Sequence, residues 1–275
     1  MSDSPAVELP QIGLKHPVVR RVVSIARNSA PNPERLVVAE GLWAHDRLLE
    51  SDVWVPAFLW CPEAVDRPEP RRRAEQMQAR ADRSYQISAK TLARISERTA
   101  PDGLISLAAL PHHEPATFAF GADALVMVAD GMEIPGNLGT LLRTLDACGA
   151  DCLVLTNRKT RLTHPKVFRA SQGVLLRLPV LDLERPEDAI RWLREHEFDI
   201  YLADTEAEQT YRRGDYRRGR TAFVLGSEKY GIPAAWYEAK LPRVAVPMLG
   251  WVDSLNVAIS AAVLLFEARA QKDGW

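Results

Sequence analysis

Residues 124–143 read ALVMVADGMEIPGNLGTLLR, an apolar run of strand length followed by a polar turn and a helical pattern. Pro135-Gly136 marks the turn, and Asn137 is well suited to cap the helix that follows. Because helical side chains lean toward the helix N-terminus, we expect Arg143 to lie over the bare Gly139 and to extend toward the Asn137 loop. A guanidinium there would suit an anion or a phosphate, and the alternative is a capped helix with no further role.

The rest of the C-terminal half repeats this alternation of strand and helix. Apolar runs of strand length occur at 152–155, 199–203, 222–225 and 244–246, and helical patterns separate them. The alternation predicts an α/β fold with a parallel sheet that is covered on both faces. Ligands of such sheets bind at the carboxyl ends of the strands, so the loops after these runs are the candidate sites.

Two further loops follow predicted strands. Residues 226–233, GSEKYGIP, carry two glycines that permit close approach of the backbone to a ligand, and they lack the Walker pattern of phosphate-binding loops. Residues 246–256, VPMLGWVDSLN, precede a run at 257–266 that is apolar on nearly every side, so we expect that helix to be largely buried. A buried Asn256 would need partners in the loop backbone or in a substrate, although it could also be a satisfied core residue with Ser254 as the helix cap.

Together the three loops resemble the three ordered motifs of SpoU-type RNA methyltransferases, a branch of the SPOUT superfamily. The matching patterns are Asn137-x-Gly139-x3-Arg143, then Leu225-Gly226-Ser227-Glu228-x2-Gly231-Ile232, then Val246-Pro247-Met248 with Ser254-Leu255-Asn256-Val257. The similarity spans about 124–270, and 165–173 resembles the family's stretch between the first two motifs. The resemblance implies an RNA 2′-O-ribose methyltransferase that uses S-adenosylmethionine. It also implies a sheet whose C-terminal segment forms a trefoil knot, and a homodimer in which the first motif works near the partner's cofactor.

The resemblance implies a role for each matched position. The cofactor should contact Gly226, Val246 and Leu255, mostly through their backbone, with Ala203 a further candidate at the end of its strand. Five positions are implied in catalysis: Arg143, Asn137, Glu228, Ser254 and Asn256. The arginine would activate the 2′-hydroxyl or stabilise its negative charge, and the other four would hold the ribose, the arginine and the loops, although Glu228 could be purely structural. Because a free guanidinium is a very poor base, a base role for Arg143 needs an RNA phosphate or a neighbouring group.

The N-terminal half also alternates helix and strand. We expect helices near 18–26, 42–49 and 70–82 and strands at 36–39, 58–60, 85–87 and 104–107. The stretch 110–115 holds two prolines and reads as a linker, so we expect domains at 1–112 and 120–275. Residues 35–41 resemble the N-terminal domain of two-domain members, which is similar to ribosomal protein L30e, and this implies a smaller α/β domain that binds the RNA substrate.

The charge balance limits where RNA could bind. The chain carries 35 Lys and Arg against 36 Asp and Glu, so a generally basic surface is absent and any RNA contact must be local. Basic clusters occur around 20–27, at 71–73 and at 212–220. The candidates that we select for RNA binding are Arg20, Arg21, Arg27 and Arg169.

Cysteine usage and the distribution of apolar residues exclude other classes. Cys61, Cys148 and Cys152 are too few for a disulfide framework and lack the spacing of zinc ligands, so we expect buried free thiols and no metal. The chain opens without a secretory signal and has no apolar run of membrane-spanning length, so we expect a cytoplasmic protein with no membrane partner.

Other functions of α/β proteins predict different residue patterns. A nucleotide-binding dehydrogenase or a Rossmann-type methyltransferase should carry Gly-x-Gly-x2-Gly after its first strand, and that pattern is missing. A non-catalytic RNA-binding paralogue remains an alternative, although retention of the five polar motif positions argues against it. The most favoured target is 23S ribosomal RNA, with transfer RNA as the alternative, and the purpose could be ribosome maturation or antibiotic resistance.

Overall fold

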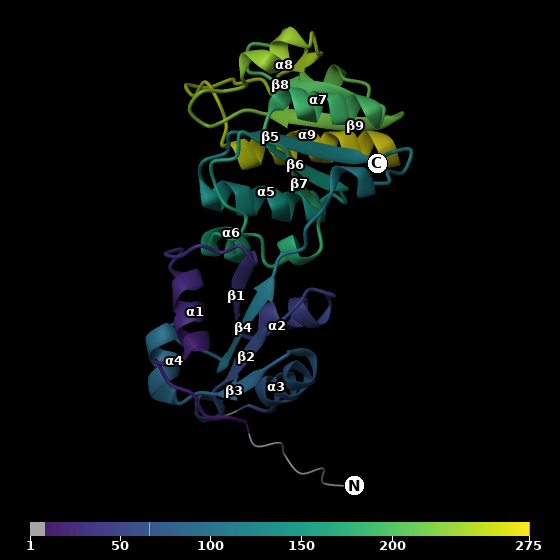
Figure 1. The fold of residues 1–275 in the computed structure, drawn as a ribbon. Coiled ribbons are helices and arrows are strands. Elements are labelled where there is room, and N and C mark those ends of the chain that lie inside the picture. Colours follow the sequence, from purple (N-terminus) through teal and green to yellow (C-terminus); the bar gives the residue numbers. More distant parts are fainter. Residues whose placement is uncertain (1–8, 66, 275) are drawn as a thin grey trace. The chain divides into compact units, whose positions relative to one another are not determined.

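The computed structural model describes residues 9–65 and 67–274. These divide into two compact units. The first comprises the residues up to Pro111 together with Thr163–Pro165, and the second comprises His112–Leu162 and the residues from Lys166 onward (Figure 1).

The first unit is built on a four-stranded mixed sheet. Its strand order is β1 (Leu36–Glu40), β4 (Leu104–Ala109), β2 (Ala57–Trp60) and β3 (Ser84–Gln86). β4 runs antiparallel to both β1 and β2, whereas β3 runs parallel to β2. The four strands expected from the sequence are therefore confirmed.

The helices of this unit are α1 (Pro17–Ala26), α2 (Leu42–Leu49), α3 (Pro68–Arg80) and α4 (Ala89–Ile95). In α1, residues Val19, Val22 and Ile25 recur every three positions and are all buried, which explains why this segment folds as an amphipathic helix. The three predicted helices are confirmed. The sequence interpretation missed α4, a seven-residue helix whose signal is the cap at Ser88, which accepts a hydrogen bond from the backbone N–H of Thr91.

The second unit is built on a six-stranded sheet in which every pairing is parallel. The strand order is β10 (Arg243–Val244), β8 (Phe198–Ala203), β9 (Arg220–Leu225), β5 (Leu125–Asp130), β6 (Cys152–Thr156) and β7 (Val180–Asp182). All five predicted strands and the parallel sheet are confirmed. The three-residue β7 was missed because so short an edge strand leaves no periodic pattern in the sequence.

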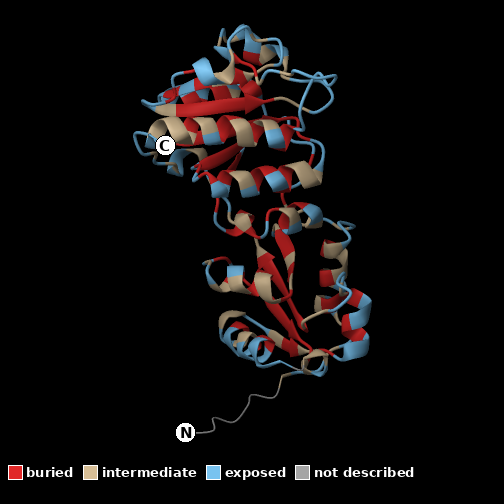
Figure 2. Cartoon of the chain, turned by 180° about the vertical axis from the view of Figure 1, so that it is seen from behind, coloured by how far each residue is buried: buried red, intermediate tan, exposed pale blue. Residues whose placement is uncertain are grey.

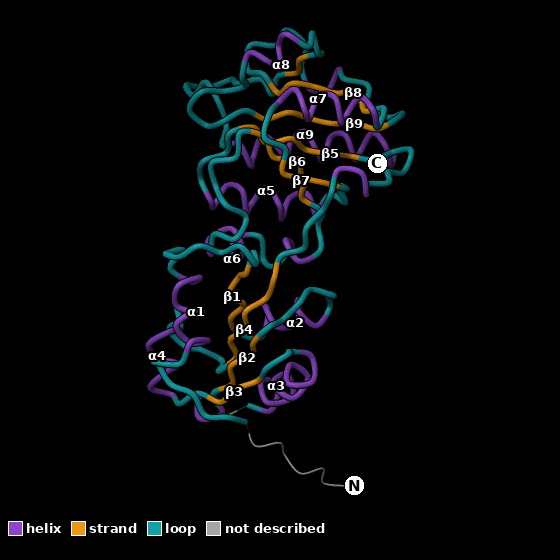
Figure 3. The backbone as a smooth tube through the Cα atoms, in the orientation of Figure 1, coloured by secondary structure: helices purple, strands orange, loops and turns teal. Residues whose placement is uncertain are grey.

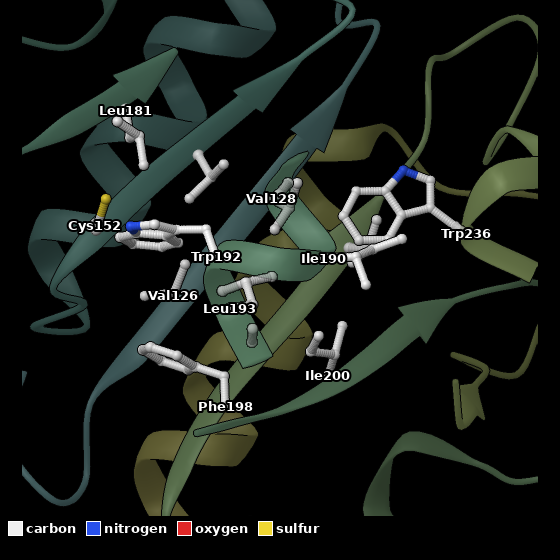
Figure 4. Packing of buried hydrophobic residues seen from close by; sticks show 14 of the residues in the cluster. Val126, Val128, Cys152, Leu181, Ile190, Trp192, Leu193, Phe198, Ile200 and Trp236 are labelled. Carbon is white, nitrogen blue, oxygen red and sulfur yellow. The ribbon is translucent and has the colours of Figure 1, made fainter. Parts of the chain in front are cut away.

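Helices cover both faces of this sheet, as predicted. One face packs against α7 (Pro186–Glu195) and α8 (Ala234–Glu238), with Trp192 and Trp236 among the strand valines and isoleucines (Figure 4). The other face packs against α9 (Val257–Asp273), which lies beside α5 (Pro135–Ala147). The strands of both units are largely buried (Figure 2).

The arrangement brings the three loops singled out in the sequence to one edge of the sheet. The first loop follows β5, the second follows β9, and the third follows β10 and leads into α9 (Figure 3). In a parallel sheet these positions are all at the carboxyl ends of the strands. Across the described residues, no helix combines the length and hydropathy that a membrane crossing requires.

Candidate active site

A cavity of about 510 Å³ lies among these loops. Its volume falls within the range of roughly 300 to 1,000 Å³ that is usual for sites of small ligands and cofactors. Eight of the sequence-predicted residues line it: Asn137, Ala203, Gly226, Glu228, Val246, Ser254, Leu255 and Asn256. The structure therefore brings together all four candidate cofactor residues and four of the five candidate catalytic residues.

The turn after β9 is closed by contact between its two glycines. The backbone N–H of Ser227 donates to the carbonyl of Gly231 at 3.0 Å, and the N–H of Gly231 donates back to the carbonyl of Ser227 at 3.0 Å. A Cβ atom on Gly226 would stand 2.1 Å from the backbone carbon of Gly231, and Gly231 itself has a φ of +69°. Glycine at 226 is thus required for the backbone approach that the sequence predicted.

A chain of polar contacts joins the three loops. The side-chain amide of Asn137 donates to Glu228 Oε1 at 2.8 Å, and Asn256 Nδ2 donates to Asn137 Oδ1 at 3.1 Å. Asn256 Oδ1 in turn accepts from the backbone N–H of Ala258 at 3.0 Å. The two contacts of Asn137 join residues 91 and 119 positions apart in the chain, so the network fixes the relative positions of loops that the sequence leaves independent.

This network corrects three expectations. Asn137 does not cap α5, because the cap is Ile134 and Asn137 lies inside the first turn. The cap of α9 is Asn256 and not Ser254, whose hydroxyl instead donates to Asp253. Asn256 is also exposed in the single chain, since the helix buries only one face and starts at the rim of the cavity.

Arg143 does not line the cavity of its own chain. It lies on an exposed part of α5, and its side chain makes no hydrogen bond or ion pair with any residue that the structure describes. The expectation of a bare glycine beneath it is wrong. Gly139 is buried against α6 (Pro165–Ala170), where an added Cβ would come within 2.5 Å of the Ala170 Cβ. The glycine is required there for helix packing.

The end of β5 is held by a buried carboxylate. Asp130 is 2% exposed and accepts hydrogen bonds from Thr156 Oγ1 at 2.7 Å, Asn157 Nδ2 at 2.9 Å and Trp236 Nε1 at 2.9 Å. Three donors satisfy the charged group that burial would otherwise penalise. Asp130 therefore ties β5 to β6 and α8 and holds the start of the first loop.

Several residues of the cavity wall were not predicted from the sequence, and Asp204 is the most polar of them. Asp204 follows β8 directly, and its Oδ2 accepts from the Tyr237 hydroxyl at 3.2 Å and from Arg243 at 3.1 Å. Partial burial, with the Asp204 charge adding to it, raises the pKa of Tyr237. A polar residue at the carboxyl end of a parallel strand was the signal that could have identified Asp204.

The candidate RNA-binding arginines differ in their surroundings. Arg20 and Arg27 are exposed, on α1 and at its C-terminal cap, whereas Arg21 is held by Glu34, Asn32 and the carbonyl of Pro31. Arg169 is exposed on α6. Arg21 is thus the least available of the four.

The three cysteines lie in the core of the protein. All three cysteines are buried free thiols, as predicted, and burial raises the pKa of each. Within residues 9–65 and 67–274, no group of three or more His, Cys, Asp or Glu side chains is arranged to hold a metal ion.

The cavity wall suits a ligand with both apolar and polar parts. Leu225, Val244 and Leu264 supply apolar surface, and the loops supply exposed backbone together with the amides and carboxylates described above. Such a wall fits a nucleoside joined to a charged amino-acid chain, with the nucleoside against the apolar part.

The amino-acid sequence is similar to those of known proteins. Residues 124–266 match the model of the SpoU rRNA methylase family. An uncharacterized tRNA/rRNA methyltransferase of Synechocystis sp. is 33% identical over 201 residues, which cover 72% of each chain. The 23S rRNA (guanosine-2′-O-)-methyltransferase RlmB of Bordetella pertussis is 29% identical over 209 residues, or 73% of this chain and 83% of the relative.

Solved structures resemble the chain along nearly its whole length. An RNA 2′-O ribose methyltransferase is 31% identical with a TM-score of 0.77, and the alignment covers 96% of this chain and 98% of that one. An AdoMet-bound rRNA methyltransferase from Sinorhizobium meliloti shares the fold with a TM-score of 0.84 at 24% identity, covering 94% and 97% of the two chains. The chain therefore belongs to the SpoU rRNA methylase family, and as a member of it is an RNA 2′-O-methyltransferase that uses S-adenosylmethionine.

Proposed function

We propose that the chain methylates a ribose 2′-hydroxyl of 23S ribosomal RNA, with its cofactor bound in the cavity at the carboxyl edge of the second sheet. The observation that carries the proposal is the meeting of eight predicted site residues, from segments far apart in the chain, around one cavity of suitable volume. The name of the Bordetella pertussis relative supports 23S RNA as the target.

The cofactor supplies an already activated methyl group on a sulfonium, so the protein has to bind, orient and stabilise rather than activate the donor. Gly226, Val246 and Leu255 hold the cofactor mainly through their backbone, with Ala203 at the end of β8 beside them. The closed turn between Gly226 and Gly231 supports this role, because it leaves the backbone at 226 free of a side chain.

The amide network orients the ribose. Glu228 accepts from Asn137 and, more weakly, from the backbone N–H of Glu133 at 3.4 Å. Its carboxylate thus fixes which way the Asn137 amide points, and Asn256 fixes the other end of that amide. Asn137, Asn256 and Ser254 then present donors and acceptors toward the cavity, where they can bind the ribose hydroxyls.

Arg143 stabilises the negative charge that grows on the 2′-oxygen as its proton leaves. A guanidinium near that oxygen acts by electrostatic stabilisation, and the proton passes to an RNA phosphate or a neighbouring group because arginine is too weak a base. Arg143 lies outside the cavity of its own chain, which supports a role at the cavity of a second copy.

The homodimer is supported by the open face of α9. Ile259 is 50% exposed and Phe266 is 40% exposed, and they are seven residues apart on one side of the helix. α5, which carries Arg143, is the neighbouring helix. A second copy that covers this face would bury the apolar side chains and bring Arg143 of one chain toward the cavity of the other.

The C-terminal segment passes through a loop as a trefoil knot, which the return of the chain from edge strand β10 to the centre of the sheet at α9 supports. Residues 1–112 form an L30e-like domain that binds RNA through Arg20, Arg21 and Arg27, and Arg169 adds a contact from α6. The protein works in the cytoplasm.

The proposed knot predicts the result of a pulling experiment. A knotted chain that is pulled from both ends would extend less than the full contour length of its 275 residues.

Two measurements test the proposed function. Calorimetric titration with S-adenosylmethionine should give one site per chain, and labelled methyl should appear in a 23S ribosomal RNA transcript as an alkali-resistant linkage. Methylation of a transfer RNA transcript alone would favour the alternative target. Cofactor binding without methylation of either RNA would favour a non-catalytic paralogue.

A further inference from the structure

The connection between β8 and β9 carries a concentration of positive charge that the proposed site does not use. Residues 210–220 read TYRRGDYRRGR, with five arginines against one aspartate. Most parallel strands of this sheet are joined through an α-helix, but this crossover contains only the short helical turn Tyr211–Arg213. We refer to residues 211–219 as the basic segment.

The basic segment is held in place from beneath. Tyr216 is fully buried, its hydroxyl donates to the carbonyl of Tyr211 at 2.7 Å, and its backbone N–H donates to Gln271 Oε1 on α9 at 3.0 Å. The Tyr216 ring packs at 5.1 Å, centroid to centroid, from both Tyr201 and Phe223. The backbone therefore has a fixed course, and the charged side chains that it presents are pre-organised.

Four of the arginines are exposed and little neutralised. Arg213 and Arg218 make no side-chain hydrogen bond or ion pair with the described residues. Arg217 Nε lies 3.5 Å from Asp215 in a solvent-exposed pair, and Arg212 Nε lies 3.7 Å from Glu267, whose side chain is 21% exposed. Both contacts are long, so each neutralises its arginine only weakly. Four like charges within seven residues of the chain repel one another, and a bound anion would relieve that repulsion.

Arg220 is different and serves the fold. Its guanidinium donates to the carbonyls of Phe120, Gly121 and His196 at 2.8–3.0 Å. Three carbonyl acceptors occupy its donors, so Arg220 is excluded from the binding surface.

The basic segment starts next to the cavity. The backbone N–H of Tyr211 donates to the carbonyl of Ala245 at 2.9 Å, and the next residue, Val246, lines the cavity. From there the segment runs back to the amino end of β9, a strand of six residues, and so covers about 20 Å. An RNA whose ribose enters the cavity must pass its neighbouring phosphates over the surface close to this rim.

We infer that Arg212, Arg213, Arg217 and Arg218 bind the phosphate backbone of the RNA next to the methylated nucleotide. This rests on the proposed function, because it takes the cavity as the place where the target ribose docks. The contacts are electrostatic and read no bases, so they raise affinity for RNA and set the direction in which the strand leaves the site. The methyltransferase unit thereby contributes its own RNA surface.

The test uses the full chain and changes Arg213 and Arg218, the two arginines of the basic segment that have no partner among the described residues. Arg213→Glu with Arg218→Glu should raise the KM for a 23S ribosomal RNA transcript about 10- to 100-fold, while kcat at saturating RNA and the affinity for S-adenosylmethionine stay unchanged. Arg213→Gln with Arg218→Gln should lower the slope of log affinity against log salt by about 1.4 to 1.8, the amount expected for two lost phosphate contacts.

A matched control removes the same charge elsewhere on the same unit. Arg177 and Lys240 are exposed, have no side-chain partner among the described residues, and precede β7 and β10. Arg177→Glu with Lys240→Glu makes the same change in net charge and should alter the KM less than about threefold. An equal rise in the KM of both double variants would mean that only the overall electrostatic field of the protein matters, and it would overturn the inference.

Two further outcomes separate the alternatives. Filter binding of the 23S transcript needs no methyl transfer, so a wild-type chain that binds RNA with a normal salt slope but does not methylate it would overturn only the proposed function. If light scattering finds that the Arg213 and Arg218 variants lose a dimer, the basic segment is an interface between copies and the inference is wrong.

Discussion

Arg143 is the residue on which the proposed chemistry depends most. Arg143 does not line the cavity of its own chain, so Arg143→Ala should leave the affinity for S-adenosylmethionine nearly intact. Loss of a group that acts mainly when the 2′-oxygen gains charge should lower the rate of methyl transfer about a hundred- to a thousand-fold. Calorimetry and single-turnover methylation measure the two effects separately.

The conservative variant sharpens this prediction. Arg143→Lys should rescue little activity, because a point charge cannot reproduce the planar fork of a guanidinium. Normal methylation by Arg143→Ala would show that the active site is wrongly assigned, and loss of cofactor binding would make Arg143 a structural residue.

Gly226 offers a second test at the scale of one atom. Gly226→Ala adds a Cβ at 2.1 Å from the Gly231 backbone, so the turn must open, and the affinity for S-adenosylmethionine should fall about tenfold or more. Gly136→Ala is the matched control, since nothing lies within 4 Å of its added Cβ and alanine suits the helix that contains it. If calorimetry finds the two variants equal, the turn is not part of the cofactor site.

At the scale of elements, α1 presents the RNA-binding candidates of the first unit. Arg20 and Arg27 are seven residues apart and so lie on one side of the helix, whereas Arg21 is engaged by Glu34. Arg20→Glu with Arg27→Glu should weaken binding of a 23S transcript about tenfold and flatten its salt dependence. Unchanged affinity in a filter-binding assay would move the RNA surface of this unit to other elements.

The packing of α2 against β4 makes the first unit sensitive to acid. His45 is fully buried, its Nδ1–H donates to the Gly41 carbonyl at 2.8 Å, and its Nε2 accepts from the Ser106 hydroxyl at 3.0 Å. Burial, to which the Arg73 charge adds, lowers the pKa of His45 from 6.5 to about 4, against the weaker opposing effects of the Gly41 hydrogen bond and Asp102. Between pH 6.5 and about pH 4, His45 therefore binds a proton in the unfolded chain but not in the folded chain.

Neutral His45 should make its full contribution to the free energy of unfolding above pH 6.5, and this contribution should fall as the pH drops toward 4. The loss approaches about 3 kcal/mol below pH 4. Urea unfolding at pH 7 and pH 4.5, followed by amide exchange in the β1 and β4 peptides, measures it in the full chain. His45→Gln should be less stable at pH 7 but should have a smaller pH dependence, and an equal dependence in both proteins would exclude His45 as its source.

At the scale of the whole molecule, the open face of α9 predicts a homodimer at micromolar concentration. Phe266→Glu would place a charge in the contact between the two copies, so light scattering should detect monomers. Methyl transfer should also be lost, because Arg143 of one copy would no longer lie near the cavity of the other. Leu14→Glu is the matched control, since Leu14 is 45% exposed and Phe266 is 40% exposed. A wild-type monomer that methylates RNA at full rate would contradict the shared site.

Particular residues show how far local sequence reasoning reaches. Strand positions such as 125–130 and 220–225 were predictable because long apolar runs between helical patterns have one common solution in a parallel sheet. The helix caps were not predictable from the sequence. Asn137 and Asn256 each had a plausible local role, and the contact between them joins residues 119 positions apart. Local propensity carries no information about such a partner.

The amino-acid sequence by itself determined the strand and helix pattern, the parallel sheet and the three loops at its carboxyl edge, because hydrophobic periodicity and turn chemistry act over a few residues. Only the tertiary structure decided that Gly139 serves helix packing and that Arg143 stands apart from the cavity of its own chain. It also decided that the arginines of the basic segment lie on an anchored surface that starts at the rim of the cavity. Those properties depend on which distant segments meet, and that is set by the burial of the whole core and not by any short stretch of the chain.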